Sequence, residues 1–138
     1  MYQITRSAAL RSLPEFRKYI NLACSQRGCI AKQVIGDLQL AVDEACTNII
    51  THGYNGMNPG SIILSLEFTD DWIEVTITDF GLAFEPSPAP APNLEAGLED
   101  RPTGGFGIFF IYQTMDQIDY TSNLYGNRLT FIKKWNPH

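Results

Sequence analysis

The sequence has few of the residues that build metal centres or covalent cross-links. Three cysteines and two histidines occur in 138 residues, and no two cysteines have CxxC spacing. A structural zinc site needs Cys and His ligands in close pairs, so we do not expect one. Cys24, Cys29 and Cys46 are therefore predicted to be reduced structural thiols.

Long hydrophobic runs are also absent, and positive charge is scarce. No segment approaches the roughly 20 consecutive apolar residues that cross a bilayer, and residues 1–6 lack the apolar core of a secretory signal. The formal net charge is −5, which disfavours binding to nucleic-acid phosphates or anionic lipids. We expect a cytoplasmic protein that binds neither nucleic acid nor membrane.

The remaining composition is that of a globular protein. Hydrophobic residues make up 44% of the chain and charged residues 18%, well away from the composition of disordered proteins. The length matches one domain, and no internal repeat is present. We therefore treat residues 1–138 as a single domain.

Hydrophobic periodicity predicts helices and then paired strands. Ser12 and Glu15 have the spacing of a capping box, and the apolar stripe after them predicts a helix that stops near Gly28. A broader apolar face predicts a second helix over residues 31–52. Strands are expected over residues 2–6, 61–68, 72–79, 117–121 and 127–134. These elements predict an α+β fold, a two-layer sandwich with helices on one face of a mixed, mostly antiparallel sheet.

One segment fits neither a helix nor a strand. Five of the eight prolines lie between positions 86 and 102, so residues 83–107 are expected to form a long functional loop, or lid. The loop ends in Thr103-Gly-Gly-Phe-Gly107, before an apolar helix over residues 108–115. Backbone N–H groups of such a turn can bind an anion, although a flexible hinge explains the glycines equally well.

Two further patterns place polar side chains on regular elements. Glu44 and Asn48 are four residues apart, so they share a face of the second helix, beside its apolar stripe. Such a carboxylate can act as a base and such an amide oxygen can bind a hard cation, but the pair is also ordinary on a solvated helix. Asp79 and Gly81 follow a strand, where the carboxylate can enter a ligand crevice or simply form an Asp-x-Gly turn.

The order of these patterns resembles the GHKL ATPase superfamily. Within it, residues 40–54 are similar to the N box of the small anti-sigma factor serine/threonine kinases of the RsbW and SpoIIAB type. Residues 79–86 are similar to their G1 box, and residues 104–108 resemble their G2 box. The resemblance covers nearly the whole chain.

The resemblance implies an ATP-dependent protein kinase. It makes Glu44 the general base and Asn48 the holder of the Mg²⁺ that bridges the ATP phosphates. Asp79 would accept a hydrogen bond from the adenine amino group, Gly81 would leave room for the ring, and Thr130 would lie on the nucleotide side of the last strand. The residues implied to cradle the phosphates are Thr103, Gly104, Gly105 and Gly107.

The resemblance also implies protein partners. The substrate would be a serine or threonine of a STAS-type anti-sigma antagonist, and the same chain would sequester a sigma factor. A homodimer is expected, with the edge strand at residues 2–6 and the first helix as its surfaces. The proline-rich lid, in which Arg101 is the only cation, departs from the family pattern. A non-catalytic, nucleotide-gated partner-switching regulator is the alternative.

Overall fold

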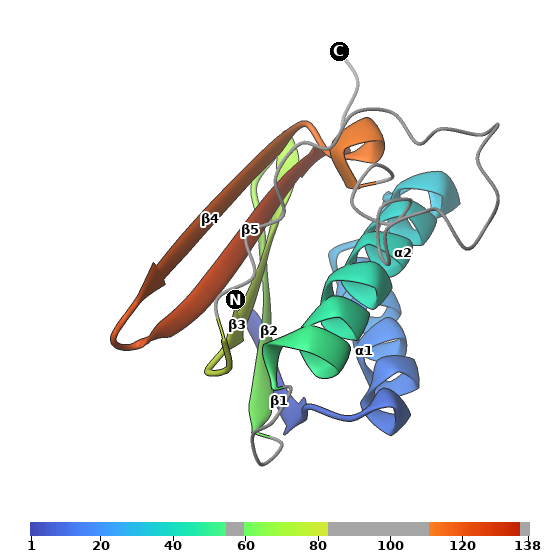
Figure 1. Cartoon of the computed structure of the whole chain (residues 1–138). Helices are drawn as coiled ribbons and strands as arrows, with labels where there is room; N and C mark the ends of the chain where they lie inside the picture. The colour runs from blue at the N-terminus through green and yellow to red at the C-terminus, as the bar shows by residue number, and fades with distance from the viewer. Residues whose placement is uncertain (55–59, 83–110, 136–138) are drawn as a thin grey trace, which may run out of the picture.

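A computed structural model describes residues 1–54, 60–82 and 111–135. Two helices lie against one face of a five-stranded sheet (Figure 1). The strands are β1 (Tyr2–Ser7), β2 (Ser61–Phe68), β3 (Trp72–Asp79), β4 (Gln117–Asn123) and β5 (Gly126–Lys134). The helices are α1 (Leu13–Arg27), preceded by the 3-10 turn η1 (Leu10–Ser12), and α2 (Lys32–Asn48), followed by the π-helical turn η2 (Ile49–Gly53).

The sheet has the strand order β1-β2-β3-β5-β4. All four pairings in the described part of the chain are antiparallel. The predicted two-layer arrangement, with helices on one face of a mostly antiparallel sheet, is therefore confirmed. The bounds predicted for β2 and β3 are also those observed.

The core lies between the helices and one face of the sheet. Ile73, Val75 and Ile77 of β3 are fully buried on that face, and the polar residues that alternate with them point to the other. Phe16 of α1 and Leu38 of α2 are buried in the same cluster. Burial on a single face explains why the strands show a clean alternation in the sequence.

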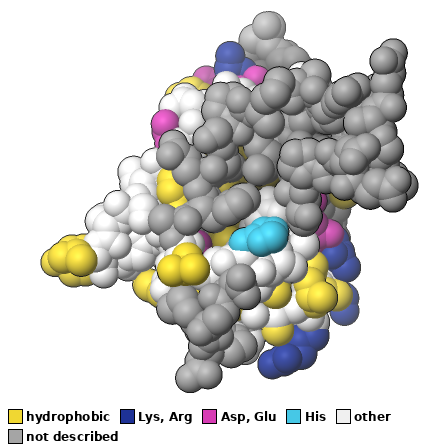
Figure 2. Space-filling model, viewed as in Figure 1, with side chains coloured by type: hydrophobic (Ala, Val, Ile, Leu, Met, Phe, Trp, Pro, Cys, Tyr) yellow, Lys and Arg dark blue, Asp and Glu magenta, His cyan; other side chains and the backbone are white. Residues whose placement is uncertain are grey.

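The β4–β5 hairpin is tighter than predicted. The strands predicted over residues 117–121 and 127–134 leave five residues between them, but Asn123 pairs directly with Gly126. Gly126 has φ of +128°, a conformation that favours glycine and lets the chain reverse after two residues. Hydrophobic side chains project at the free end of this hairpin (Figure 2).

The predicted capping box at the start of α1 was wrong. Ser12 has helical backbone angles and its side chain makes no capping hydrogen bond. Glu15 instead accepts a hydrogen bond from Nε of Arg6 at 2.9 Å. Because η1 runs straight into α1, Ser12 cannot take the extended conformation that a capping residue needs. The predicted end at Gly28 is confirmed, with φ of +80°.

The second helix changes form before its predicted end. It is α-helical only to Asn48, and residues Ile49–Gly53 form the π turn η2. Within it, the N–H of Tyr54 donates to the carbonyl of Ile49 at 3.3 Å. Single π turns inside helices occur frequently at functional sites, and this one directly follows Asn48.

The cysteines behave as structural or isolated thiols. Cys24 and Cys46 are buried and Cys29 is exposed, and all three are free. Among the helices described, none is long and apolar enough to cross a membrane.

Candidate functional site

The candidate site lies where the end of α2 packs over the end of β3. There the N–H of Leu82 donates to the carbonyl of Gly53 in η2. A Cβ on Gly81 would lie 2.7 Å from the carbonyl carbon of Gly53, which is too close for any side chain. Gly81 therefore serves the close approach of two backbones. That Gly81 also leaves room for an adenine ring remains a prediction.

Asp79 is the buried carboxylate of this site. It is only 5% exposed. Its Oδ1 accepts hydrogen bonds from the N–H of Gly81 and from Nδ2 of Asn127, both at 2.9 Å. Its Oδ2 accepts none from the described residues. Buried polar atoms are nearly always hydrogen-bonded, so Oδ2 is an acceptor available to a donor other than the described residues.

Asn127 holds this carboxylate in place, and the sequence reasoning missed it. Its side chain is 3% exposed. Besides Asp79, its Nδ2 contacts the carbonyl of Gly81 at 2.9 Å, and its Oδ1 accepts a hydrogen bond from Oγ of Ser122 at 2.6 Å. The register places Asp79, Asn127 and Ser122 side by side on β3, β5 and β4. No local sequence pattern indicated this contact, because it depends on the pairing of strands that lie far apart in the chain.

The structure does not bring Thr130 to Asp79. Thr130 pairs with Thr76, and the two Oγ1 atoms are 3.4 Å apart on the face away from the helices. An odd offset along a strand reverses the face, and Thr130 is three residues beyond Asn127. The prediction that placed Thr130 on the side of Asp79 is therefore wrong, and Asn127 is the residue of β5 that contacts Asp79.

Glu44 and Asn48 share one side of α2, as predicted. Asn48 is 5% exposed, and its side-chain amide has no hydrogen bond within the described chain. Glu44 is half-buried. Burial raises the pKa of Glu44, and the nearby charge of Asp43 raises it further. A partly desolvated carboxylate and a buried amide that no described residue satisfies are both suited to a bound ligand.

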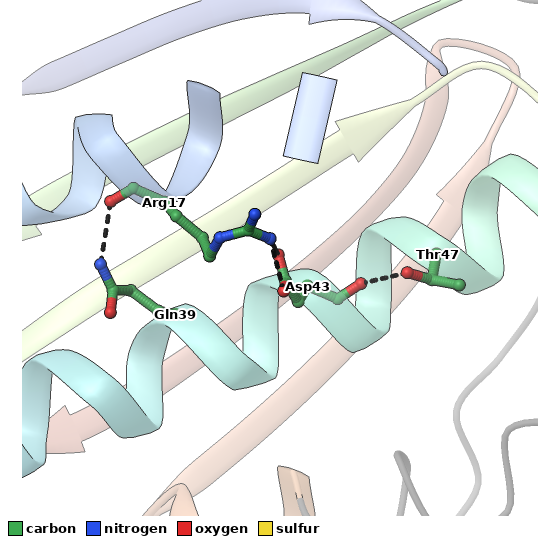
Figure 3. Close-up of polar contacts among 4 residues, drawn as sticks. All are labelled: Arg17, Gln39, Asp43 and Thr47. Carbon is green, nitrogen blue, oxygen red and sulfur yellow. Dashed lines mark hydrogen bonds and ion pairs between the residues drawn. The ribbon is translucent and has the colours of Figure 1, made fainter. Parts of the chain in front are cut away.

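Asp43 is directed toward α1 and ties the two helices together (Figure 3). Nη1 of Arg17 donates to both of its carboxylate oxygens, at 2.9 and 2.7 Å. Nε2 of Gln39 donates to the carbonyl of Arg17 at 3.0 Å, and Oγ1 of Thr47 donates to the carbonyl of Asp43 at 2.7 Å. These contacts fix the rotation of α2 about its axis, and with it the direction of Glu44.

Tyr54 joins the start of β2 to the end of β3. Its hydroxyl donates to the carbonyl of Ser61 at 2.9 Å and accepts from the N–H of Phe80 at 3.0 Å. Burial raises the pKa of Tyr54, the Phe80 hydrogen bond lowers it, and the charge of Asp79 raises it. Tyr54 thus holds the backbone next to Asp79 in place.

The other predicted site residues lie outside the described chain. These are Thr103, Gly104, Gly105 and Gly107, with the lid expected over residues 83–107. The helical residues 111–114 that follow are anchored, because Nζ of Lys133 donates to the carbonyl of Thr114 at 2.6 Å. The same Nζ is 3.4 Å from a carboxylate oxygen of Asp37 on α2.

Comparisons with known proteins agree with this geometry. Residues 6–133 match the family described as the histidine kinase-like ATPase domain. The chain is 33% identical to the serine/threonine-protein kinase BtrW of Bordetella bronchiseptica, over 72% of this chain and 70% of that protein. It is 35% identical to the serine-protein kinase RsbW of Oceanobacillus iheyensis, over 72% of this chain and 65% of that protein. It is 33% identical to an anti-sigma F factor of Clostridium botulinum, over 74% of this chain and 72% of that protein.

A solved structure shares the fold. It is the histidine kinase domain of the blue-light activated histidine kinase EL346 of Erythrobacter litoralis, with a TM-score of 0.53. The match has 18% sequence identity and covers 91% of this chain and 60% of that one. At 18% identity, this match shows that the two chains share a fold and says nothing further about function.

Proposed function

Since the chain belongs to the histidine kinase-like ATPase domain family, we propose that it transfers a phosphoryl group from ATP to a serine or threonine of a STAS-type anti-sigma antagonist. Its similarity to serine/threonine-protein kinases and to an anti-sigma factor makes it a protein kinase of that group. The same chain is proposed to sequester a sigma factor.

The observation that supports this proposal is the hydrogen bonding of the buried Asp79 carboxylate. One oxygen of its buried carboxylate is fixed by Gly81 and Asn127, and the other accepts no hydrogen bond from the described residues. The amino group of adenine is a donor of the right kind for that oxygen. ATP binding follows from the family, and we assign the adenine end of ATP to Asp79.

Asn48 fits the proposed role of a magnesium ligand. Its amide is buried and unsatisfied in the described chain, and Mg²⁺ prefers oxygen ligands from one or two protein groups, phosphates and water. No group of three or more His, Cys, Asp or Glu side chains able to hold a metal occurs among the described residues. When bound, magnesium neutralises charge on the phosphates.

Glu44 is the proposed general base. It lies one helical turn before Asn48 on the same side of α2. The raised pKa of its carboxyl, caused first by burial and then by Asp43, makes it a stronger base once it is ionised. Phosphoryl transfer depends mainly on positioning and charge neutralisation, so a base and a metal ligand on one rigid helix supply much of what it needs.

We also propose that the chain forms a homodimer through β1. This strand lies at the edge of the sheet and pairs only with β2 in the described part of the chain. Unpaired backbone groups on an edge strand readily pair with a second strand.

The test is calorimetric titration of ATP and ADP, with and without Mg²⁺, followed by a phosphotransfer assay on a STAS-type antagonist. Asp79→Asn should weaken nucleotide binding by about tenfold or more, because it replaces an acceptor oxygen on a charged group. Asp119→Asn is the matched control, since Asp119 is exposed on β4 and faces away from the helices. Undiminished affinity in Asp79→Asn would refute the adenine assignment. Tight ATP binding without any transfer would instead identify a nucleotide-gated regulator.

A further inference from the structure

The sheet face away from the helices carries a polar hollow at the β4–β5 hairpin. Thr78, Arg128 and Thr121 lie in one line across β3, β5 and β4. Together with Asn123, Tyr125 and Gly126, they line a hollow of about 220 Å³. These described residues offer a guanidinium group, hydroxyls and an amide, and none of them carries a carboxylate. Every one of these groups can donate a hydrogen bond to an oxyanion.

Arg128 differs from three other arginines of the chain. Arg6, Arg17 and Arg27 each form an ion pair with an acidic side chain. Arg128 forms none with any described residue. A guanidinium group presents several donors in a fixed plane, which suits a carboxylate held by two hydrogen bonds.

The hairpin tip beside the hollow is apolar. The two turn residues are Leu124, which is fully exposed, and Tyr125, which is 87% exposed. Neither Leu124 nor Tyr125 has a positive φ, so the turn does not call for Asn, Asp or Gly at these two positions and accepts many residue types. Here the turn is held by Oδ1 of Asn123, which accepts from the N–H of Tyr125 at 2.8 Å. The Leu–Tyr pair is therefore not required by the turn, and it adds exposed apolar surface of the kind found at interfaces.

We propose that the Arg128 hollow and the Leu124–Tyr125 tip form a docking surface for an acidic segment of a protein partner. A carboxylate of that segment is held by Arg128 and the threonine hydroxyls, and an adjacent apolar side chain packs on Leu124 and Tyr125. Charge complementarity supports this partner. The complementarity is local: Arg128 forms no ion pair with a described residue and so attracts a carboxylate, although the net charge of the chain is −5.

This surface is separate from the site of Asp79. Arg128 follows Asn127 on β5, and consecutive strand residues face opposite sides of the sheet. A docked segment and a bound nucleotide therefore occupy different faces. The inference does not depend on phosphoryl transfer, and its test can fail or succeed independently of the kinase reaction.

The test is a two-dimensional NMR titration of the ¹⁵N-labelled full chain with the peptide acetyl-Glu-Leu-Glu-amide. We expect saturable shifts at Thr78, Thr121 and Arg128. The glutamine peptide acetyl-Gln-Leu-Gln-amide, at matched ionic strength, should bind about tenfold more weakly because it lacks the charge-assisted contact. Arg128→Gln should weaken the binding of the glutamate peptide by the same factor. The control Arg11→Gln, which changes an exposed arginine in η1, should leave that binding unchanged.

Three results would overturn the proposal. They are no saturable shift at the hollow, equal response to the two peptides, or unchanged binding in Arg128→Gln. The comparison of the two peptides on the unmodified chain keeps the test valid even if a variant folds poorly. Nucleotide affinity measured on Arg128→Gln should equal that of the parent chain, which separates this surface from the site of Asp79.

Discussion

Replacing Asn127 with alanine tests the geometry of the candidate site most directly. The change removes the hydrogen bonds that Nδ2 donates to Asp79 and to Gly81, and it removes the acceptor of the Ser122 hydroxyl. The bond to the carboxylate is charge-assisted and buried, so it contributes about 2 kcal/mol, and the neutral bonds contribute about 1 kcal/mol together. We therefore expect a loss of about 3 kcal/mol in the free energy of unfolding.

The assay is urea unfolding followed by circular dichroism, with thermal unfolding beside it. For a chain of this length a loss of about 3 kcal/mol corresponds to a fall in Tm of roughly 10 °C. Because Asp79 loses one of its two donors, we also expect ATP affinity to fall by about tenfold. The folded state should persist, since domains are usually stable by about 5 kcal/mol or more.

Thr130→Ala is the matched control on the same strand. Thr130 lies on the other face, and the one hydrogen bond of its side chain to a described residue is the 3.4 Å contact with Thr76. Its loss should therefore cost under about 1 kcal/mol and leave ATP affinity unchanged. The reasoning is refuted if Asn127→Ala loses less than about 1 kcal/mol and keeps full affinity. It is equally refuted if Thr130→Ala weakens ATP binding instead.

Three further outcomes are expected. Glu44→Gln should abolish phosphotransfer and leave ATP affinity unchanged. A general base works only when it is ionised, and burial raises the pKa of Glu44. As the pH is lowered, kcat of the parent chain should therefore begin to fall at a higher pH than it would with a glutamate of ordinary pKa. Gly81→Ala should destabilise the fold by about 3 kcal/mol in urea unfolding because its Cβ meets backbone. Gly36→Ala in the second turn of α2, where no described atom lies within 4 Å of the new Cβ, should instead stabilise the fold by up to about 1 kcal/mol. In labelling with a thiol reagent at pH 8, exposed Cys29 should react first, and Cys46, whose pKa is raised by its burial, should react only on unfolding.

Sequence reasoning succeeded wherever the evidence for an element was local. The alternation in β2 and β3 and the apolar stripe of α2 each lie within one short stretch of chain, so their bounds or faces could be read directly. The spacing of Ser12 and Glu15 was equally local but misleading, because the turn η1 before it had no clear pattern. The close approach of Gly81 to another backbone segment was among the alternatives that a glycine allows.

The composition of the site depended on strand pairing that no local pattern contains. Asn127 and Thr130 are both polar residues of β5, and only the register against β3 decides which one faces Asp79. A shift of one residue reverses every side chain of a strand. The partner of Asp79 was therefore beyond what motif spacing could decide, although the resemblance had already indicated the correct strand.

The π turn after Asn48 has a consequence for how this chain tolerates changes in length. Deleting one residue from Ile49–Gly53 would let the helix continue as a regular α-helix, and each residue of an α-helix advances by 1.5 Å and turns by about 100°. The N–H of Tyr54 would then bond to the carbonyl of Ile49 as the i→i+4 bond of that regular helix, so Tyr54 should still reach Ser61 and Phe80. An inserted residue would instead turn Tyr54 by about 100° away from both partners. The turn between Asn48 and Tyr54 can therefore lose one residue without moving Tyr54 but cannot gain one. An insertion there should be far more damaging than a single deletion or the substitution of an exposed side chain such as Thr51.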